Sequence, residues 1–137
     1  MDIDRFKHQH VEILDGIATL RKFSHAGVKE HAHEIAQAIV ALSTVVKLHL
    51  AIEDRILYPA LQNGSNPQLS QMGKAYQDDM KGIASGYIAF SRQWSSPSAI
   101  AAQAEQFRTE ANTVLKTLFS RMQKENSEFY PAIESMS

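Results

Sequence analysis

Apolar side chains recur at steps of three and four residues in four separate parts of the chain. This spacing predicts amphipathic α-helices, because positions three and four apart lie on one face of a helix. The first helix is expected to end near Gly27, the second at the turn sequence NGSNP, and the third at QWSSPSA. The predicted core stripes are Ile3, Phe6, Ile13, Ile17 and Leu20, then Ile35, Ile39, Leu42, Val46, Ile56 and Ala60, then Leu69, Met72, Ile83 and Phe90, and finally Phe107, Ala111, Val114, Leu118, Met122 and Phe129.

Strand signals are weak across the whole chain. No segment sustains the alternation of apolar and polar residues that a half-buried strand shows, and no Asn-Gly turn joins two β-branched runs. Four amphipathic helices with short connections predict an all-α fold, an antiparallel up-down-up-down four-helix bundle. With 137 residues, the chain suits a single domain over residues 1–137 with one hydrophobic core.

Part of the second predicted helix is repeated in the fourth. EDRILYPAL at residues 53–61 returns as ENSEFYPAI at residues 125–133, which is 72 positions later. A weaker match, 66 positions apart, joins HVEILDGIA at 10–18 to YQDDMKGIA at 76–84. These matches indicate a duplicated helical hairpin. The proline in each YPA lacks the N–H that a helix interior needs, so we expect a kink or a terminal turn there.

Polar side chains interrupt the apolar stripes at core positions on all four predicted helices. A buried carboxylate or imidazole without a partner is strongly destabilising. One such residue could be satisfied by a local hydrogen bond, whereas gaps at similar distances from the helix ends on every helix indicate a shared partner. The residues in these gaps are His10, His49, Glu53, Tyr76, Asp79 and Glu125.

A metal ion explains this set of polar residues. Imidazole nitrogen together with carboxylate oxygen suits iron, manganese or zinc. The step from His49 to Glu53 in HLAIE puts both side chains on one helix face, one turn apart. That pair alone also fits a buried hydrogen bond between the two side chains. Because His10 and Glu125 lie in matching gaps, metal binding is the favoured interpretation.

The composition narrows the classes of function. The formal net charge of −1 provides no strong field for nucleic acid or an anionic membrane, and the absence of cysteine excludes disulfides, thiolate zinc sites and cysteine nucleophiles. The N-terminal sequence MDIDRFKHQH is polar, and no uninterrupted apolar run approaches the ~18 residues of a membrane span. We therefore expect a cytoplasmic protein with neither a nucleic-acid nor a membrane partner.

On these residues, the chain resembles the hemerythrin-like, HHE cation-binding domain family over essentially its whole length. The family pattern has an early histidine on helix one and H-x-x-x-E on helix two, followed six residues later by proline. Here these residues are His10, His49, Glu53 and Pro59. The resemblance implies a four-helix bundle with a non-haem di-iron centre, in which the two histidines are terminal ligands and Glu53 is a bridging ligand. Glu125 matches the second bridging carboxylate, since it also lies six residues before a proline.

The second half departs from that family pattern. Arg121 stands four residues before Glu125 where a histidine is usual, and Tyr76 stands at the position of the helix-three histidine. Three states of the site follow: a single metal, two metals with the second held by oxygen ligands such as Tyr76, Asp79 and Glu125, or no metal. In the metal-free state, Arg121 would occupy the second site and pair with Glu125 or Asp79. A metal-binding but non-standard site is favoured.

These observations favour a metal-binding protein with one or two non-haem iron ions, and with manganese or zinc as other candidates. The resemblance implies a role in handling iron, or in binding or sensing a small diatomic ligand such as O2 or NO. The alternative is a degenerate, metal-free bundle that acts as a structural or protein-interaction module, with Tyr58, Trp94 and Tyr130 on a partner surface. No activated nucleophile or acid–base pair over a cleft indicates an enzyme, and the oligomeric state stays open, a homodimer included.

Overall fold

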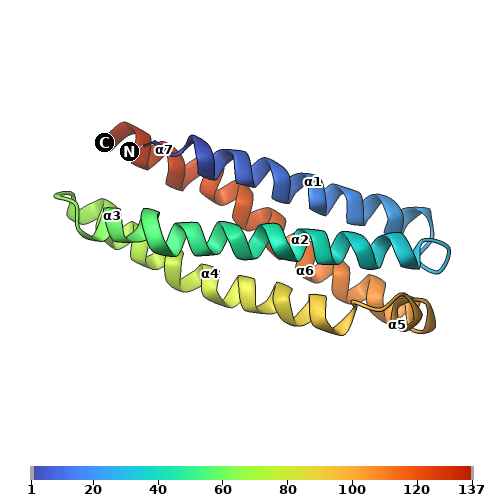
Figure 1. Cartoon of the computed structure of the whole chain (residues 1–137). Helices are drawn as coiled ribbons and strands as arrows, with labels where there is room; N and C mark the ends of the chain where they lie inside the picture. The colour runs from blue at the N-terminus through green and yellow to red at the C-terminus, as the bar shows by residue number, and fades with distance from the viewer. Residues whose placement is uncertain (1, 137) are drawn as a thin grey trace.

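The computed structural model describes residues 2–136, which form helices and short connections without a β-strand in that range. Four rods lie side by side: α1, the α2–η1–α3 run, α4, and the α6–η2–α7 run (Figure 1). The prediction of an all-α four-helix bundle is confirmed. The helical elements are α1 (Asp4–Ala26), α2 (Ala32–Ile52), η1 (Glu53–Leu57), α3 (Tyr58–Gln62), α4 (Pro67–Gln93), α5 (Pro97–Ala102), α6 (Ala104–Lys124), η2 (Glu125–Phe129) and α7 (Tyr130–Met136).

Short connections reverse the chain between successive rods. After α1, Gly27 has a φ of +141°, a conformation that glycine adopts without strain, and it ends the helix where the sequence predicts. Asn66 caps α4, because its side chain accepts hydrogen bonds from two backbone N–H groups of the first turn. Ser96 caps the short helix α5 between α4 and α6, which has Pro97 at its first position.

Both helices that carry a YPA sequence continue past the proline. The segments η1 (Glu53–Leu57) and η2 (Glu125–Phe129) are π-helical and occupy equivalent positions of the repeat. In each, the N–H of the tyrosine before the proline donates to the carbonyl of the glutamate five residues earlier. The wider turn accommodates the proline, which has no N–H to donate and crowds the preceding turn of an α-helix. A π-helical turn within a continuous helix therefore takes the place of the expected kink or terminal turn.

The π-helical turn changes which residues face the core after Glu53. The α-helical spacing predicts that Ile56 and Ala60 belong to the core stripe, yet Ile56 is 48% exposed and Ala60 is also exposed. Leu57 and Tyr58 are buried instead. The extra residue in the turn rotates the following residues around the helix axis, so the prediction for Ile56 and Ala60 is wrong.

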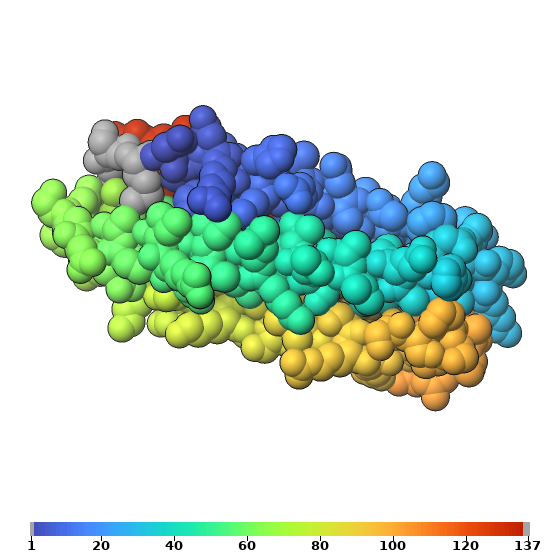
Figure 2. Space-filling model, viewed as in Figure 1, coloured from blue at the N-terminus to red at the C-terminus, as the bar shows by residue number. Residues whose placement is uncertain are grey.

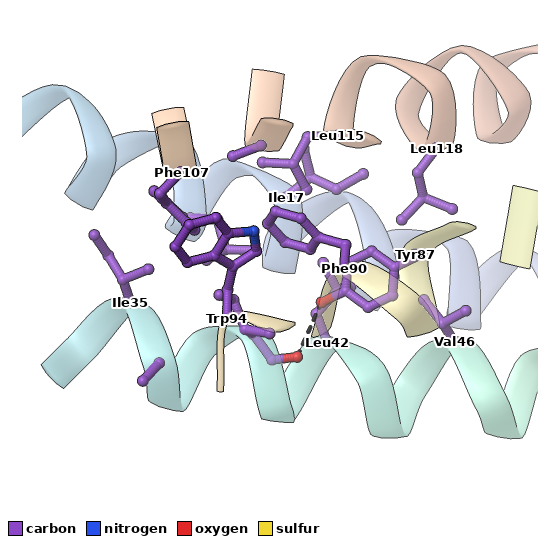
Figure 3. Close-up of a cluster of buried hydrophobic side chains, with 14 of the residues drawn as sticks. Ile17, Ile35, Leu42, Val46, Tyr87, Phe90, Trp94, Phe107, Leu115 and Leu118 are labelled. Atoms are coloured by element: carbon purple, nitrogen blue, oxygen red, sulfur yellow. Dashed lines mark hydrogen bonds between the residues drawn. The ribbon is translucent and has the colours of Figure 1, made fainter. Parts of the chain in front are cut away.

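A layer of polar side chains divides the hydrophobic core into two clusters. The larger cluster fills the part of the bundle nearer α5, where Tyr87, Phe90, Trp94 and Phe107 pack among aliphatic side chains (Figure 3). The smaller cluster lies nearer the chain termini and α3. On three of the rods, buried histidine, glutamate and arginine side chains lie where the residues of one cluster give way to those of the other. The charged or ionisable members of this layer are His10, His49, Glu53, Arg121 and Glu125.

Only part of the apolar stripe predicted for α4 faces the core. Gly73 and Ala84 are buried, whereas Met72 and Ile83 are only partly buried. Gly73 allows a close approach, because a Cβ there would lie 3.0 Å from a leucine side chain of α3. The inward face of α4 thus combines these small residues with large ones, and the predicted stripe is right for Leu69 and Phe90 but not for Met72 and Ile83.

The α2–η1–α3 run, Ala32–Gln62, is the one helix among residues 2–136 that is long and apolar enough to span a membrane, and its most apolar 18-residue window has a mean hydropathy of 1.8. Figure 2 shows this rod flanked by α1 and α4 on one face of the molecule. Part of its hydropathy comes from the outward side chains Val40 and Leu48, each 54% exposed. The remainder comes from its core stripe, so the same length and composition suit a core helix of a bundle, which is the packing observed.

Two exposed glycines in α4, Gly82 and Gly86, provide a stability test. No neighbouring atom lies within 4 Å of where a Cβ would be placed at either position. Because glycine in a helix interior destabilises by about 0.5–1 kcal/mol relative to alanine, the Gly82→Ala/Gly86→Ala variant should raise the free energy of unfolding by about 1–2 kcal/mol in urea denaturation. Gly27→Ala should lower it, since a φ of +141° is strained for alanine. An unchanged or lower stability of the double variant would contradict the prediction.

Candidate metal centre

Four polar side chains from three rods meet at one point of the polar layer. Each offers a ligand atom, and these atoms all lie within 4.8 Å of one another. The four residues are His10 of α1, His49 of α2, Glu53 of η1 and Glu125 of η2. The side chain of His10 is 1% exposed and the other three are 0% exposed. The structure thus brings together the residues that interrupt three of the predicted apolar stripes.

The distances within the cluster suit ligands of one ion. His10 Nε2 lies 3.1 Å from His49 Nε2 and 2.9 Å from Glu125 Oε1. His49 Nε2 lies 3.3 Å from Glu53 Oε1, one helical turn further along, and 3.9 Å from Glu125 Oε1. Bonds of about 2.0–2.2 Å to a common metal place the ligand atoms about 3–4 Å apart. The observed spacings lie close to this range.

An amide side chain outside the cluster orients each histidine. His10 Nδ1 lies 2.8 Å from Asn126 Oδ1, and His49 Nδ1 lies 2.8 Å from Gln9 Oε1. Because an amide oxygen only accepts hydrogen bonds, both Nδ1 atoms are donors. In the neutral imidazoles, both Nε2 atoms therefore turn their lone pairs toward the cluster. Outer partners of this kind fix the tautomer and the ring orientation of metal-ligating histidines.

Two imidazole lone pairs and two carboxyl groups thus converge in a site that is closed to solvent. Electron-pair donors buried together repel one another unless a cation lies among them. Imidazole nitrogen and carboxylate oxygen are ligands of iron, manganese and zinc. The residues present therefore fit a metal ion, and the isolated His49–Glu53 hydrogen bond considered for the sequence is not enough to describe the site.

In the absence of a metal, protons provide the positive charge of the cluster. Burial alone would lower the pKa of His49, but hydrogen bonds with Glu125 and Glu53 outweigh it and raise the pKa to about 9. Burial, followed by the charge of Glu125, raises the pKa of Glu53. Burial would raise the pKa of Glu125 as well, yet hydrogen bonds from both histidines and the charge of Arg121 hold it well below its usual range. The two carboxyl groups therefore differ in their affinity for a proton.

Arg121 fills the neighbouring part of the layer, where the repeat would place a second-half histidine. It is 4% exposed, its Nε donates to Glu125 Oε2 at 2.8 Å, and its Nη2 donates to the carbonyl of Tyr76. Glu125 therefore bridges two partners, with Oε1 toward His10 and Oε2 toward the guanidinium. This is the pairing that the sequence predicts for Arg121 in the metal-free state.

The structure does not place Tyr76 and Asp79 with the four clustered residues. The side chain of Asp79 is 68% exposed and lies 4.0 Å from Arg121 Nη1. The Tyr76 phenol donates to Glu128 Oε2 at 3.0 Å, and its ring packs under the guanidinium. Met80 rather than Asp79 faces the core at this level of α4. A second metal on these oxygen ligands does not fit, because the cationic Arg121 lies against both residues.

Two tyrosines that the sequence reasoning missed reach the cluster. Tyr130 Oη lies 2.9 Å from His10 Nε2, and Tyr58 Oη lies 3.5 Å from Glu53 Oε1. On an α-helix, a residue five positions after a glutamate points away from it, whereas a π-helical turn returns it to the same face. Burial, together with the neighbouring glutamate charges, raises the pKa of both phenols. The signal for them is the sequence Glu-x-x-x-x-Tyr-Pro in both copies of the repeat.

A four-helix bundle with two histidines and two glutamates around one point of its core defines a class: helical bundles with a histidine–carboxylate metal site. Over residues 1–133 the chain matches the hemerythrin HHE cation-binding domain, and it belongs to that family. No curated protein and no solved structure matches the chain. The resemblance stated from the sequence is confirmed. Members of the family bind metal cations, typically iron, and the histidine–glutamate cluster fits such a site.

Proposed function

We propose that this domain binds a single iron ion through its four clustered side chains. The main support for this proposal is the orientation of the two histidines. Amide partners hold the Nε2 lone pairs of His10 and His49 inward, where they meet two buried carboxyl groups. Bound iron would supply the cation that these donors lack. The proposed ligands are His10, His49, Glu53 and Glu125.

Arg121 supports one ion rather than two. Its guanidinium stays charged in proteins, and it holds Oε2 of Glu125 at 2.8 Å, where a bridging carboxylate would meet a second metal. A second cation at contact distance from the guanidinium would be repelled. Arg121 thus replaces the second metal as the positive charge beside Glu125.

The closed site limits what could reach a bound ion. Ligand side chains that are 0–1% exposed leave no path for a bulky substrate, so a diatomic molecule is the size of ligand that suits the site. Because classical reversible O2 binding of this family uses two irons, a single iron favours NO over O2 as the ligand. We therefore propose NO sensing or iron handling as the role of the domain.

Metal stoichiometry tests the proposal. Protein purified without chelator and then reconstituted anaerobically with ferrous ion should hold one iron per chain by elemental analysis. Parallel samples reconstituted with manganese and with zinc show which of the three metals the site retains best. At free metal about 100 times the Kd, linkage should stabilise the fold by about 2.7 kcal/mol, a rise in Tm of about 10 °C. NO added to the ferrous protein should change its absorption spectrum. Two irons per chain would contradict the mononuclear site, and an unaltered spectrum would contradict the NO ligand.

One observation favours the metal-free alternative. Among residues 2–136, the buried side-chain nitrogen or oxygen atom without a hydrogen-bond partner is Ser24 Oγ alone, so the polar layer is also satisfied without an ion. No metal after reconstitution and an unchanged Tm would establish this alternative. The partner surface predicted at Tyr58, Trp94 and Tyr130 is wrong in either case, because all three side chains are buried.

A further inference from the structure

The hydroxyl of Tyr130 lies among the proposed ligand atoms and has no assigned role. Its Oη is 2.9 Å from His10 Nε2, 3.4 Å from Glu53 Oε2 and 3.5 Å from Glu125 Oε1. These spacings overlap the 2.9–3.9 Å that separate the histidine nitrogens from one another and from the carboxylate oxygens. Tyr130 Oη therefore occupies a donor position of the same cluster, although α-helical periodicity would turn it away.

The other tyrosines of the chain are placed differently. Tyr58, the repeat counterpart, lies 3.5 Å from a single oxygen of Glu53. The Tyr76 phenol donates to Glu128 on the outer side of Arg121. Tyr87 donates to a backbone carbonyl of α2 within the larger hydrophobic cluster. Tyr130 is thus the phenol that lies within hydrogen-bonding distance of three proposed ligand residues.

Charge balance favours binding of the Tyr130 phenol, as phenolate, to a ferric ion. With the Arg121 guanidinium counted, two carboxylates leave one positive charge around a ferrous ion and two around a ferric ion, and uncompensated charge in a buried site is strongly unfavourable. A phenolate offsets the charge that oxidation adds, and tyrosine oxygen is an established iron ligand in proteins. Binding replaces the phenolic O–H bond with an oxygen–iron bond and releases the proton to solvent.

We propose that Tyr130 is a fifth protein ligand when the site holds ferric iron. This inference rests on the mononuclear site proposed above. A phenolate on ferric iron absorbs visible light by ligand-to-metal charge transfer, whereas histidine and carboxylate ligands alone do not give the phenolate ring vibrations that accompany this band in resonance Raman spectra. The ligand therefore has a spectroscopic signature that is independent of any activity.

The test uses the full chain, loaded anaerobically with ferrous ion, oxidised with ferricyanide and desalted. Wild type, Tyr58→Phe and Tyr76→Phe should show the visible band and the phenolate vibrations. Tyr130→Phe should lose both, and its iron content is measured in the same samples. Should Tyr130→Phe fail to retain iron, the wild-type vibrations together with their persistence in Tyr58→Phe and Tyr76→Phe still identify Tyr130, because Tyr87 lies in the other cluster.

The outcomes separate this inference from the proposed function. Iron-loaded wild type without phenolate vibrations overturns the Tyr130 assignment and leaves the four-ligand site intact. Vibrations that persist in iron-loaded Tyr130→Phe, or that vanish in iron-loaded Tyr58→Phe, overturn it equally. A wild-type chain that takes up no iron at all overturns the proposed function, and the ligand assignment with it.

Discussion

Replacing His49 with alanine is expected to abolish metal binding. His49 provides one of the two imidazole donors and lies 3.1 Å from His10 Nε2 and 3.3 Å from Glu53 Oε1. Its side chain is 0% exposed, so water cannot readily take its place. Losing only an outer partner of a metal ligand costs about 10–100-fold in affinity, so losing the ligand itself should exceed about 100-fold. Isothermal titration with zinc or anaerobic ferrous ion measures the change, and elemental analysis gives the stoichiometry.

A matched control lies on the same helix. His33 of α2 is exposed, so His33→Ala should keep the wild-type stoichiometry and Kd. Since alanine at position 49 also removes a buried side chain, circular dichroism must show that the variant is folded. Gln9→Ala offers a milder test, because it keeps the imidazole and removes only the acceptor of its Nδ1–H, with an expected loss of about 10–100-fold. An unaltered metal content in folded His49→Ala would refute the ligand assignment.

The sequence predicts the bundle and the centre of the site for related physical reasons. Large apolar residues at steps of three and four predict the four rods, because burial of such side chains dominates the packing of amphipathic helices. His10, His49, Glu53 and Glu125 stand out against those stripes because charged side chains are rarely buried without a partner. The residues whose burial is energetically unfavourable are therefore the ones that the sequence pattern identifies most clearly.

The limits of prediction lie where the geometry departs from a regular α-helix. Two π-helical turns bring Tyr58 and Tyr130 into the cluster and remove Ile56 from the core, and α-helical periodicity describes neither effect. On α4, the buried stripe runs through Gly73, Tyr76 and Met80, so that Asp79 faces solvent. Backbone register and helix rotation follow from packing between rods, which no pattern within one rod contains.

Arg121 shows a third kind of limit. Its residue type and spacing are plain in the sequence, but they allow either an outward side chain or one folded onto Glu125. The structure has the second arrangement, with the guanidinium 4% exposed over Tyr76 and Met122 also in the core. Three partners on two rods hold Arg121 inward, and only the tertiary structure brings those partners together.

Removing the positive charge of Arg121 is expected to cause a large loss of stability in the metal-free protein. Arg121→Met keeps an unbranched stem but removes the guanidinium, which leaves Glu125, 0% exposed, without its 2.8 Å partner. Breaking a buried ion pair on one side costs about 3–5 kcal/mol, and after the loss of Arg121 only the two histidines still compensate the Glu125 carboxylate. Urea denaturation in the presence of a chelator measures this loss of unfolding free energy.

Two further variants show whether the uncompensated carboxylate is the cause. Arg108 of α6 forms an ion pair of similar length with Glu105, at 2.9 Å, but both side chains are at least 43% exposed. Arg108→Met should therefore cost no more than about 1 kcal/mol. Adding Glu125→Gln to Arg121→Met removes the unpaired charge and should recover a large part of the loss, which a double-mutant cycle expresses as a coupling energy. Additive effects of the two substitutions would show that Arg121 stabilises the bundle without its ion pair to Glu125, and they would remove the basis for treating its guanidinium as the substitute for a second metal.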